Sequence, residues 1–115
     1  MDAWAPVDYV APRHQREEVL MSVVVSAVAP GLNAEMYEAL TARVMPGDQL
    51  PDECELHIAG PVEQGWRVIT VWASREAFDR FREEKLLPAF RELAGDEAPP
   101  AAEPEVNPVH KLIAR

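Results

Sequence analysis

Residues 54–81 carry the strongest structural signal in the chain: CELHIAGPVEQGWRVITVWASREAFDRF. Apolar, β-branched and aromatic residues predict two strands here, over residues 54–59 and 66–72, joined by a hairpin loop over residues 60–65. Ser74 stands where a helix N-cap is expected, and the apolar spacing after it predicts a helix over residues 75–87. The middle of the chain therefore reads strand, strand, helix.

The preceding segment adds a strand and a helix to this order. A nearly continuous β-branched run predicts a strand over residues 19–28, of the kind that is covered on both faces. Asn33 is a suitable N-cap for a helix predicted over residues 34–45, and Pro46-Gly47-Asp48 ends that helix.

The following segment adds the last strand. Pro88 predicts a kink or a fresh short turn in the second helix, which Gly95 ends. A Pro/Ala-rich linker over residues 98–104 leads to a strand predicted over residues 106–113, where Pro108 indicates an edge position or a bulge. The complete order predicts an α+β fold, a ferredoxin-like βαββαβ unit with a four-stranded antiparallel sheet.

A chain of 115 residues fits one domain. We expect an N-terminal arm over residues 1–17 and the α+β domain over residues 18–115. The arm carries Trp4 and Tyr9 in a polar, proline-containing segment. Either it is a tail without fixed structure, or these rings dock on the domain or on a partner subunit.

Composition limits the partners and the compartment. The chain has 20 acidic and 11 basic side chains and a net charge of −9, so nucleic acid and acidic membrane surfaces are not expected as partners. No apolar run approaches the roughly 20 residues of a membrane span, and the first residues do not read as a signal peptide. The single cysteine, Cys54, excludes an internal disulfide. We expect a cytoplasmic protein.

Several short motifs carry a family resemblance: LHIAGP at 56–61, GWRVITVWAS at 65–74, EAF at 76–78, LLP at 86–88 and PVH at 108–110. With them, roughly residues 20–113 of this chain resemble the dimeric α/β-barrel superfamily, in particular short actinobacterial proteins similar to the antibiotic-biosynthesis monooxygenases. The resemblance implies a homodimer in which two sheets pack face to face, and a pocket between each sheet and its helices. The superfamily includes cofactor-free oxygenases, polyketide cyclases, haem-degrading enzymes and proteins with no known reaction.

The residues of the first strand also favour a homodimer. Val23 and Val25 lie on one face of the predicted strand, and Val24 and Val28 lie on the other. Helices on one side of the sheet would leave the second apolar face exposed, so we expect a partner subunit to cover it.

The hairpin assigns side chains to the two faces of the sheet. A symmetric loop would pair Ala59 with Trp66 and His57 with Val68. The face expected to form the pocket wall then carries Glu55, His57, Trp66, Thr70 and Trp72. The opposite face carries Cys54, Leu56, Ile58, Ile69 and Val71. A slip of one residue would exchange the two sets.

The candidate catalytic residues are His57 and His110, because imidazole titrates near neutral pH and can act as a general base. Each could instead be a structural or interface histidine. The three histidines lack metal-binding spacing, so we expect no metal. No cofactor is predicted, and haem held by one axial histidine stays an alternative.

A second set of residues is expected to contact a small-molecule ligand: Tyr37, Trp66, Thr70, Trp72, Phe78, Phe81 and Arg82. Trp66, Trp72 and Tyr37 could instead be packed in the core. Arg82 shares the helical stripe of Phe78, so it either reaches water past the apolar surface or holds an anionic or enolate-bearing ligand. Cys54 is expected to be inert packing.

The resemblance implies a cofactor-independent small-molecule enzyme of bacterial secondary metabolism. A monooxygenase- or cyclase-like reaction on an aromatic or polyketide-like substrate fits the resemblance, with His57 as the base. The alternative is a non-catalytic ligand-binding or assembly protein with the same dimeric fold. A continuous cavity beside His57 favours the enzyme, and close packing of Trp66, Trp72, Phe78 and Phe81 favours the alternative.

Overall fold

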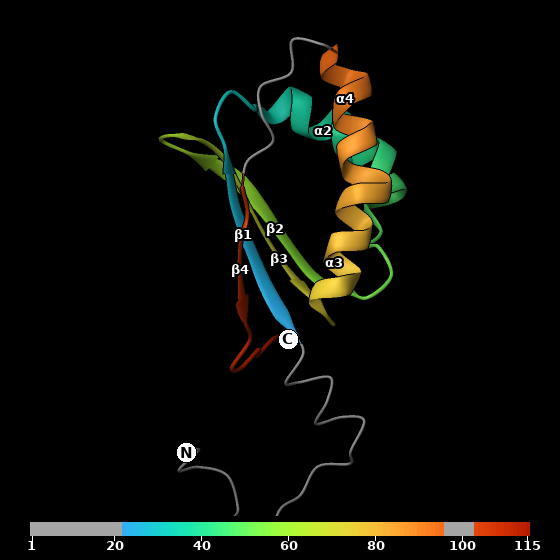
Figure 1. Cartoon of the computed structure of the whole chain (residues 1–115). Coiled ribbons are helices and arrows are strands. Elements are labelled where there is room, and N and C mark those ends of the chain that lie inside the picture. Colours follow the sequence, from blue (N-terminus) through green and yellow to red (C-terminus); the bar gives the residue numbers. More distant parts are fainter. Residues whose placement is uncertain (1–21, 96–102) are drawn as a thin grey trace, which may run out of the picture.

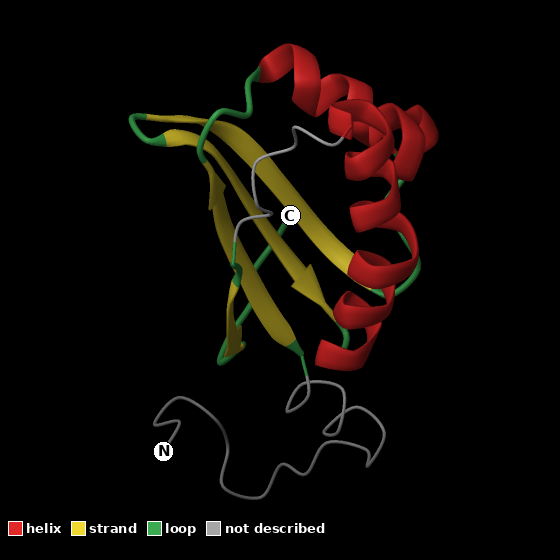
Figure 2. Cartoon of the chain, turned by 45° about the horizontal axis from the view of Figure 1, so that its top comes forward, coloured by secondary structure: helices red, strands yellow, loops and turns green. Residues whose placement is uncertain are grey.

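The computed structural model describes residues 22–95 and 103–115. Its strands are β1 (Val23–Ala29), β2 (Cys54–Val62), β3 (Gly65–Trp72) and β4 (Glu105–Pro108). They form one antiparallel sheet in the order β2-β3-β1-β4, and the helices lie together over one face of it (Figures 1 and 2). The predicted ferredoxin-like βαββαβ arrangement is confirmed. The predicted arm, with Trp4 and Tyr9, lies outside the described residues.

Helix α2 (Ala34–Val44) begins where the sequence predicts it. The side chain of Asn33 accepts a hydrogen bond of 2.9 Å from the backbone N–H of Met36, which satisfies one of the free donors of the first turn. A short 3₁₀ turn, η1 (Pro46–Asp48), follows the helix. No helix in the described part of the chain is long and apolar enough to cross a membrane.

The second helical segment contains a π turn. Helix α3 (Arg75–Phe81) starts at Ser74, whose hydroxyl accepts a hydrogen bond from the backbone N–H of Ala77, and the π turn η2 (Arg82–Leu86) joins it to α4 (Leu87–Ala94). Proline inside a regular helix removes one hydrogen bond and crowds the carbonyl four residues earlier. The π turn places Pro88 in the first turn of α4, where its missing N–H is not needed. The irregularity therefore lies over Arg82–Leu86, before Pro88, and not at Pro88 as predicted.

The hairpin between β2 and β3 is tighter than predicted. The strands extend to Val62 and Gly65, so a two-residue turn replaces the predicted loop over residues 60–65. His57 pairs with Thr70 and not with Val68. The shift is two residues, so His57, Trp66, Thr70 and Trp72 keep a common face.

Gly65 is required by the way the hairpin meets β1. Its φ of +146° is uncommon for residues with a side chain, and a Cβ at this position would lie 2.5 Å from the carbonyl oxygen of Ala29. The close backbone approach fixes the hairpin against the end of β1.

A β-bulge changes the facing of the first residues of β2. Cys54 pairs with Trp72 and Leu56 pairs with Val71, which leaves Glu55 as an extra residue. Cys54 is therefore buried on the helix-facing side, and Glu55 is exposed. The predictions that Cys54 lies on the outer face and Glu55 on the pocket face are wrong for this reason.

Strand β4 occupies an edge of the sheet, as Pro108 indicates, and pairs with β1 through Val25 and Val106. It ends at Pro108, so the predicted strand over residues 106–113 is too long. The core lies between the sheet and the helices and centres on Trp72, which is 2% exposed. Its other members are Val23, Val25, Cys54, Ala77 and Phe78, with Phe81 and Val106 packed against them.

Candidate functional site

A cavity of about 180 Å³ lies between the helix-facing side of the sheet and the helices. The sheet contributes Val25, Cys54, His57, Val68, Thr70 and Trp72 to its wall. The helical segments contribute Tyr37, Thr41, Phe78, Phe81, Arg82 and Leu86. Most of these side chains are apolar, so the few polar groups are the ones able to orient a ligand.

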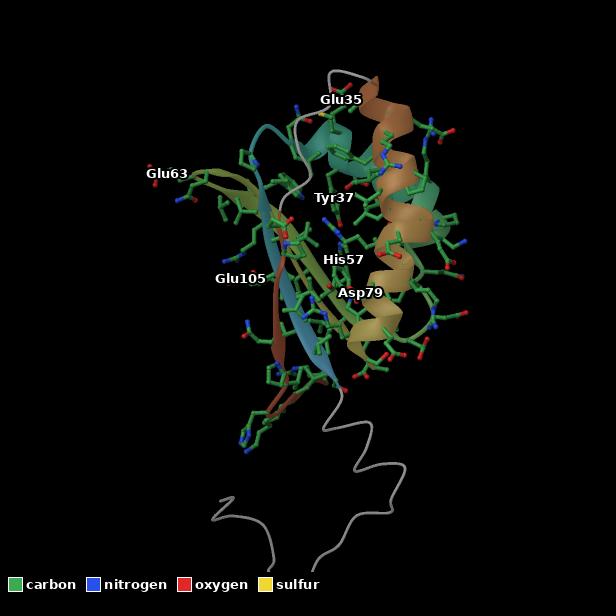
Figure 3. All side chains as sticks on the ribbon, viewed as in Figure 1. Glu35, Tyr37, His57, Glu63, Asp79 and Glu105 are labelled. Atoms are coloured by element: carbon green, nitrogen blue, oxygen red, sulfur yellow. The ribbon has the colours of Figure 1, made fainter. Side chains whose placement is uncertain are left out.

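Tyr37 and His57 form a polar contact at the wall of this cavity. The hydroxyl of Tyr37 lies 2.6 Å from Nε2 of His57, and the two rings are 5.9 Å apart. Figure 3 shows the two side chains pointing toward one another, Tyr37 from α2 and His57 from β2. Helix α2 and strand β2 are separate layers of the fold, so the contact depends on the tertiary structure.

Burial sets the protonation of this pair. It lowers the pKa of His57 below the ordinary 6.5, because the charged imidazolium is less well solvated there. Burial also raises the pKa of Tyr37 above 10.0, and the carboxylates of Glu38 and Asp48 raise it further. Near pH 7 the pair therefore consists of a neutral imidazole beside a protonated phenol.

Thr70 lies between His57 and the aromatic part of the cavity wall, which consists of Trp72, Phe78 and Phe81. It lies opposite His57 on β3, and its Oγ1 accepts a hydrogen bond of 2.9 Å from Nε1 of Trp72. The ring of Trp72 in turn contacts those of Phe78 and Phe81, at centroid distances of 5.9 and 5.1 Å. This wall is rigid, because its largest ring is fully buried and hydrogen-bonded.

Trp66 lies on the same face of the sheet, yet it is not among the residues that line the cavity. Its ring contacts that of Tyr37 at a centroid distance of 5.3 Å. Its buried Nε1 has no hydrogen-bond partner among the described residues. Trp66 therefore supports Tyr37, and the prediction that it forms the cavity wall with His57 is wrong.

His110 is not brought to the cavity. It follows the end of β4 and is exposed, because the last strand is shorter than predicted. The remaining predicted ligand-contacting residues, Tyr37, Thr70, Trp72, Phe78, Phe81 and Arg82, all line the cavity with His57.

Arg82 enters the cavity wall from the start of the π turn. The nearby Arg75 and Arg80 are paired with Asp79 and Glu53, at 3.7 and 2.9 Å. The side chain of Arg82 makes no hydrogen bond or ion pair with another described residue. It is also half-buried, which makes its charge costly to leave without a partner.

Cys54 also lines the cavity, although alternation along the strand predicts it on the outer face. Burial raises the pKa of its thiol, the backbone of Leu56 opposes that shift, and Glu55 adds to it. The thiol is therefore protonated near pH 7 and is a poor nucleophile. Among residues 22–95 and 103–115, no three His, Cys, Asp or Glu side chains are grouped so as to bind a metal.

No protein-family model matches the chain, and no curated protein matches it. Among solved structures it is similar to a conserved protein from Methanosarcina mazei Go1, with a TM-score of 0.54 and 10% sequence identity. The match covers 78% of this chain and 94% of that chain. At this identity the likeness shows the fold alone, a ferredoxin-like α+β fold, and function has to be argued from the site. The resemblance to the dimeric α/β-barrel superfamily stays a prediction.

Proposed function

We propose that this protein is a cofactor-independent small-molecule enzyme of bacterial secondary metabolism, monooxygenase- or cyclase-like, acting on an aromatic or polyketide-like substrate. The observation that carries the proposal is the contact between Tyr37 and His57 at the wall of an apolar cavity. A neutral imidazole and a protonated phenol in direct contact provide a base and a hydrogen-bond donor at one place.

The pair suits a reaction that begins by removing a proton from a phenol, an enol or an activated C–H group. His57 takes the proton, directly or through the hydroxyl of Tyr37, which bonds to its Nε2. The hydroxyl then stabilises the oxygen anion that forms on the substrate. The apolar surroundings exclude water, so this interaction is stronger than it would be in solution.

Two reactions can follow from such an anion. In a monooxygenase, a CH₂ group of the substrate reacts with O₂: one oxygen atom becomes a carbonyl oxygen, and the other leaves as water with the two hydrogens. In a cyclase, the enolate carbon attacks a carbonyl of the same molecule, a C–C bond forms and water is lost. Both need a base, a donor and a dry cavity.

Turnover assays test this proposal. We would follow oxygen uptake with 2-tetralone as a two-ring activated methylene probe, and ring closure by absorbance with a 2-acylphenyl diketone. His57→Gln and Tyr37→Phe are expected to lower kcat by about 100-fold or more, as for loss of a general base. His110→Gln, outside the cavity, is the matched control and should retain full activity. Equal rates for His57→Gln and the unaltered protein would overturn the role of His57.

The alternative is a non-catalytic ligand-binding or assembly protein with the same fold. The close packing of Trp72 with Phe78 and Phe81 favours it, since these rings fill much of the space beneath α3. Probe binding without turnover in either assay would support this alternative.

We also propose that the protein works in the cytoplasm as a homodimer formed by the outer face of the sheet. Paired strands place Val24 beside Val71 and Leu56, and Ile69 beside Ile58, on the face away from the helices. On this face Ile58 is 51% and Val28 36% exposed. A second copy packed on this face would remove Ile58 and Val28 from water, whereas Val71 is already buried within one chain.

A further inference from the structure

We infer that the cavity selects an aromatic ligand of one or two rings that carries an acidic oxygen group, and that Arg82 is the residue that pairs with this group. The inference rests on the proposed function, because it takes the cavity beside Tyr37 and His57 to be the ligand site.

The volume of the cavity limits the ligand. An engineered apolar cavity of about 150 Å³ is sufficient to bind benzene. The cavity here measures about 180 Å³ and is walled by the rings of Trp72, Phe78 and Phe81. One ring with substituents, or a compact two-ring system, fits this space. A four-ring polyketide exceeds it.

The charge of the wall defines the polar group of the ligand. Arg82 is the one charged residue among the described residues of the wall, and none of these is Asp or Glu. The absence of Asp and Glu from these wall residues contrasts with the whole chain, in which acidic side chains outnumber basic ones 20 to 11. A carboxylate or phenolate would be attracted by the wall and would meet no like charge in it.

The guanidinium N–H groups of Arg82 are available to bind a ligand. Its neighbours Arg75 and Arg80 have carboxylate partners, whereas Arg82 has no hydrogen bond or ion pair to another described residue. Guanidinium binds planar oxyanions through two parallel hydrogen bonds. The π turn that begins at Arg82 is a kind of helix irregularity often found at functional sites.

The arrangement of the wall sets the orientation of the ligand. Arg82 belongs to the helical side, and His57 and Thr70 belong to the sheet. A ligand whose anion pairs with Arg82 can therefore present its opposite edge to His57 and Thr70. The acidic group of this ligand would bind Arg82. A different C–H or O–H group of the ligand would react.

Calorimetric titration with three matched probes tests the inference. The probes are 2-naphthoate, its neutral analogue 2-naphthamide, and a four-ring pyrene carboxylate. We expect 2-naphthoate to bind about tenfold or more tightly than 2-naphthamide, the effect of one charged hydrogen-bonded pair. Pyrene carboxylate should bind about tenfold or more weakly than 2-naphthoate because it exceeds the cavity.

Variants assign the preference to Arg82. Arg82→Gln should abolish the preference for 2-naphthoate and leave the affinity for 2-naphthamide within about twofold, and Arg82→Lys should retain part of the preference. Arg80→Gln, exposed and paired with Glu53, is the matched control and should keep the full preference. Thermal unfolding of each variant shows that the fold is retained.

Several outcomes would overturn the inference. These are equal binding of the two naphthalene probes, a preference that survives Arg82→Gln, or no binding of either probe. A preference that survives would mean that the guanidinium reaches water instead. The proposed function fails in a different way: 2-naphthoate would bind through Arg82 while the turnover assays, which use uncharged probes, show no dependence on His57.

Discussion

The hydroxyl of Tyr37 and Nε2 of His57 lie 2.6 Å apart, although α2 and β2, which carry them, belong to different layers of the fold. The contact ties the first helix to an edge strand of the sheet. It also places the most basic neutral group of the cavity next to a hydroxyl, so its removal has consequences for stability as well as for chemistry.

Tyr37→Phe should lower the free energy of unfolding by about 1 kcal/mol, the typical net contribution of one hydrogen bond. The ring contacts with Trp66 and His57 remain available to phenylalanine, so larger losses are not expected. Chemical denaturation measures the change, and the ¹⁵N shifts of His57 report the loss of its partner. Unaltered shifts would contradict the contact.

The stability of the protein should depend on pH through His57. Its pKa is lowered in the folded state, so below the ordinary value of 6.5 the unfolded chain binds a proton that the folded chain does not. The free energy of unfolding therefore carries the full contribution above about pH 6.5 and loses it as the pH falls toward the lowered pKa. Denaturation between about pH 5 and pH 8 should show a smaller decrease for His57→Gln than for the unaltered protein.

The two tryptophans of β3 should respond differently to replacement by phenylalanine. Trp72→Phe removes the bond to Thr70 and opens space in the core, and should cost about 2–3 kcal/mol. Trp66→Phe removes a buried N–H that has no partner among the described residues, so the lost area is offset and the cost should stay within about 1 kcal/mol. Paired denaturation curves check this difference, and equal costs would contradict it.

Gly65→Ala should destabilise the hairpin by about 2 kcal/mol or more. Its backbone has φ of +146°, and the added Cβ would meet the backbone of Ala29 and Pro30. Gly60→Ala is the matched control on the other strand, because nothing lies within 4 Å of its added Cβ, and its effect should be within about 0.5 kcal/mol. Melting temperatures of the two variants give the comparison.

Ile58→Lys should convert the proposed homodimer to a monomer, because it puts a charge on the exposed apolar face of the sheet. Leu50→Lys, at a similarly exposed position outside the sheet, should leave the dimer intact. Sedimentation velocity at micromolar concentration distinguishes the two states. If the unaltered protein sediments as a monomer, the proposal of a homodimer is wrong.

The order of the elements and the faces of most strands could be predicted because they depend on local patterns. The hairpin register was wrong by two residues, yet His57 and Thr70 kept a common face because side chains alternate with a period of two. An error of one residue would have exchanged the faces. The caps at Asn33 and Ser74 were equally local, since each depends on a backbone N–H three residues ahead.

The remaining features depend on tertiary structure. The bulge that turns Cys54 toward the cavity arises from how β2 pairs with β3, and alternation along one strand does not reveal an extra residue. The contact of Tyr37 with His57 requires the packing of α2 on the sheet. The exposure of His110 follows from where β4 ends, and strand ends are poorly marked by composition.

The π turn before Pro88 makes the shape of the cavity depend on the length of the chain. Each residue advances a regular helix by about 100°, and the π turn takes up one extra residue without that rotation. A further residue inserted between Arg82 and Leu86 would rotate α4 by about that angle relative to α3. Leu87 and Phe90 would then leave the wall that they share with Arg82. A single insertion in this turn would thus change which ligands fit, while the Tyr37 and His57 side chains stayed in place. Divergence of substrate range in proteins of this architecture can proceed through such a length change, without any substitution in the polar pair.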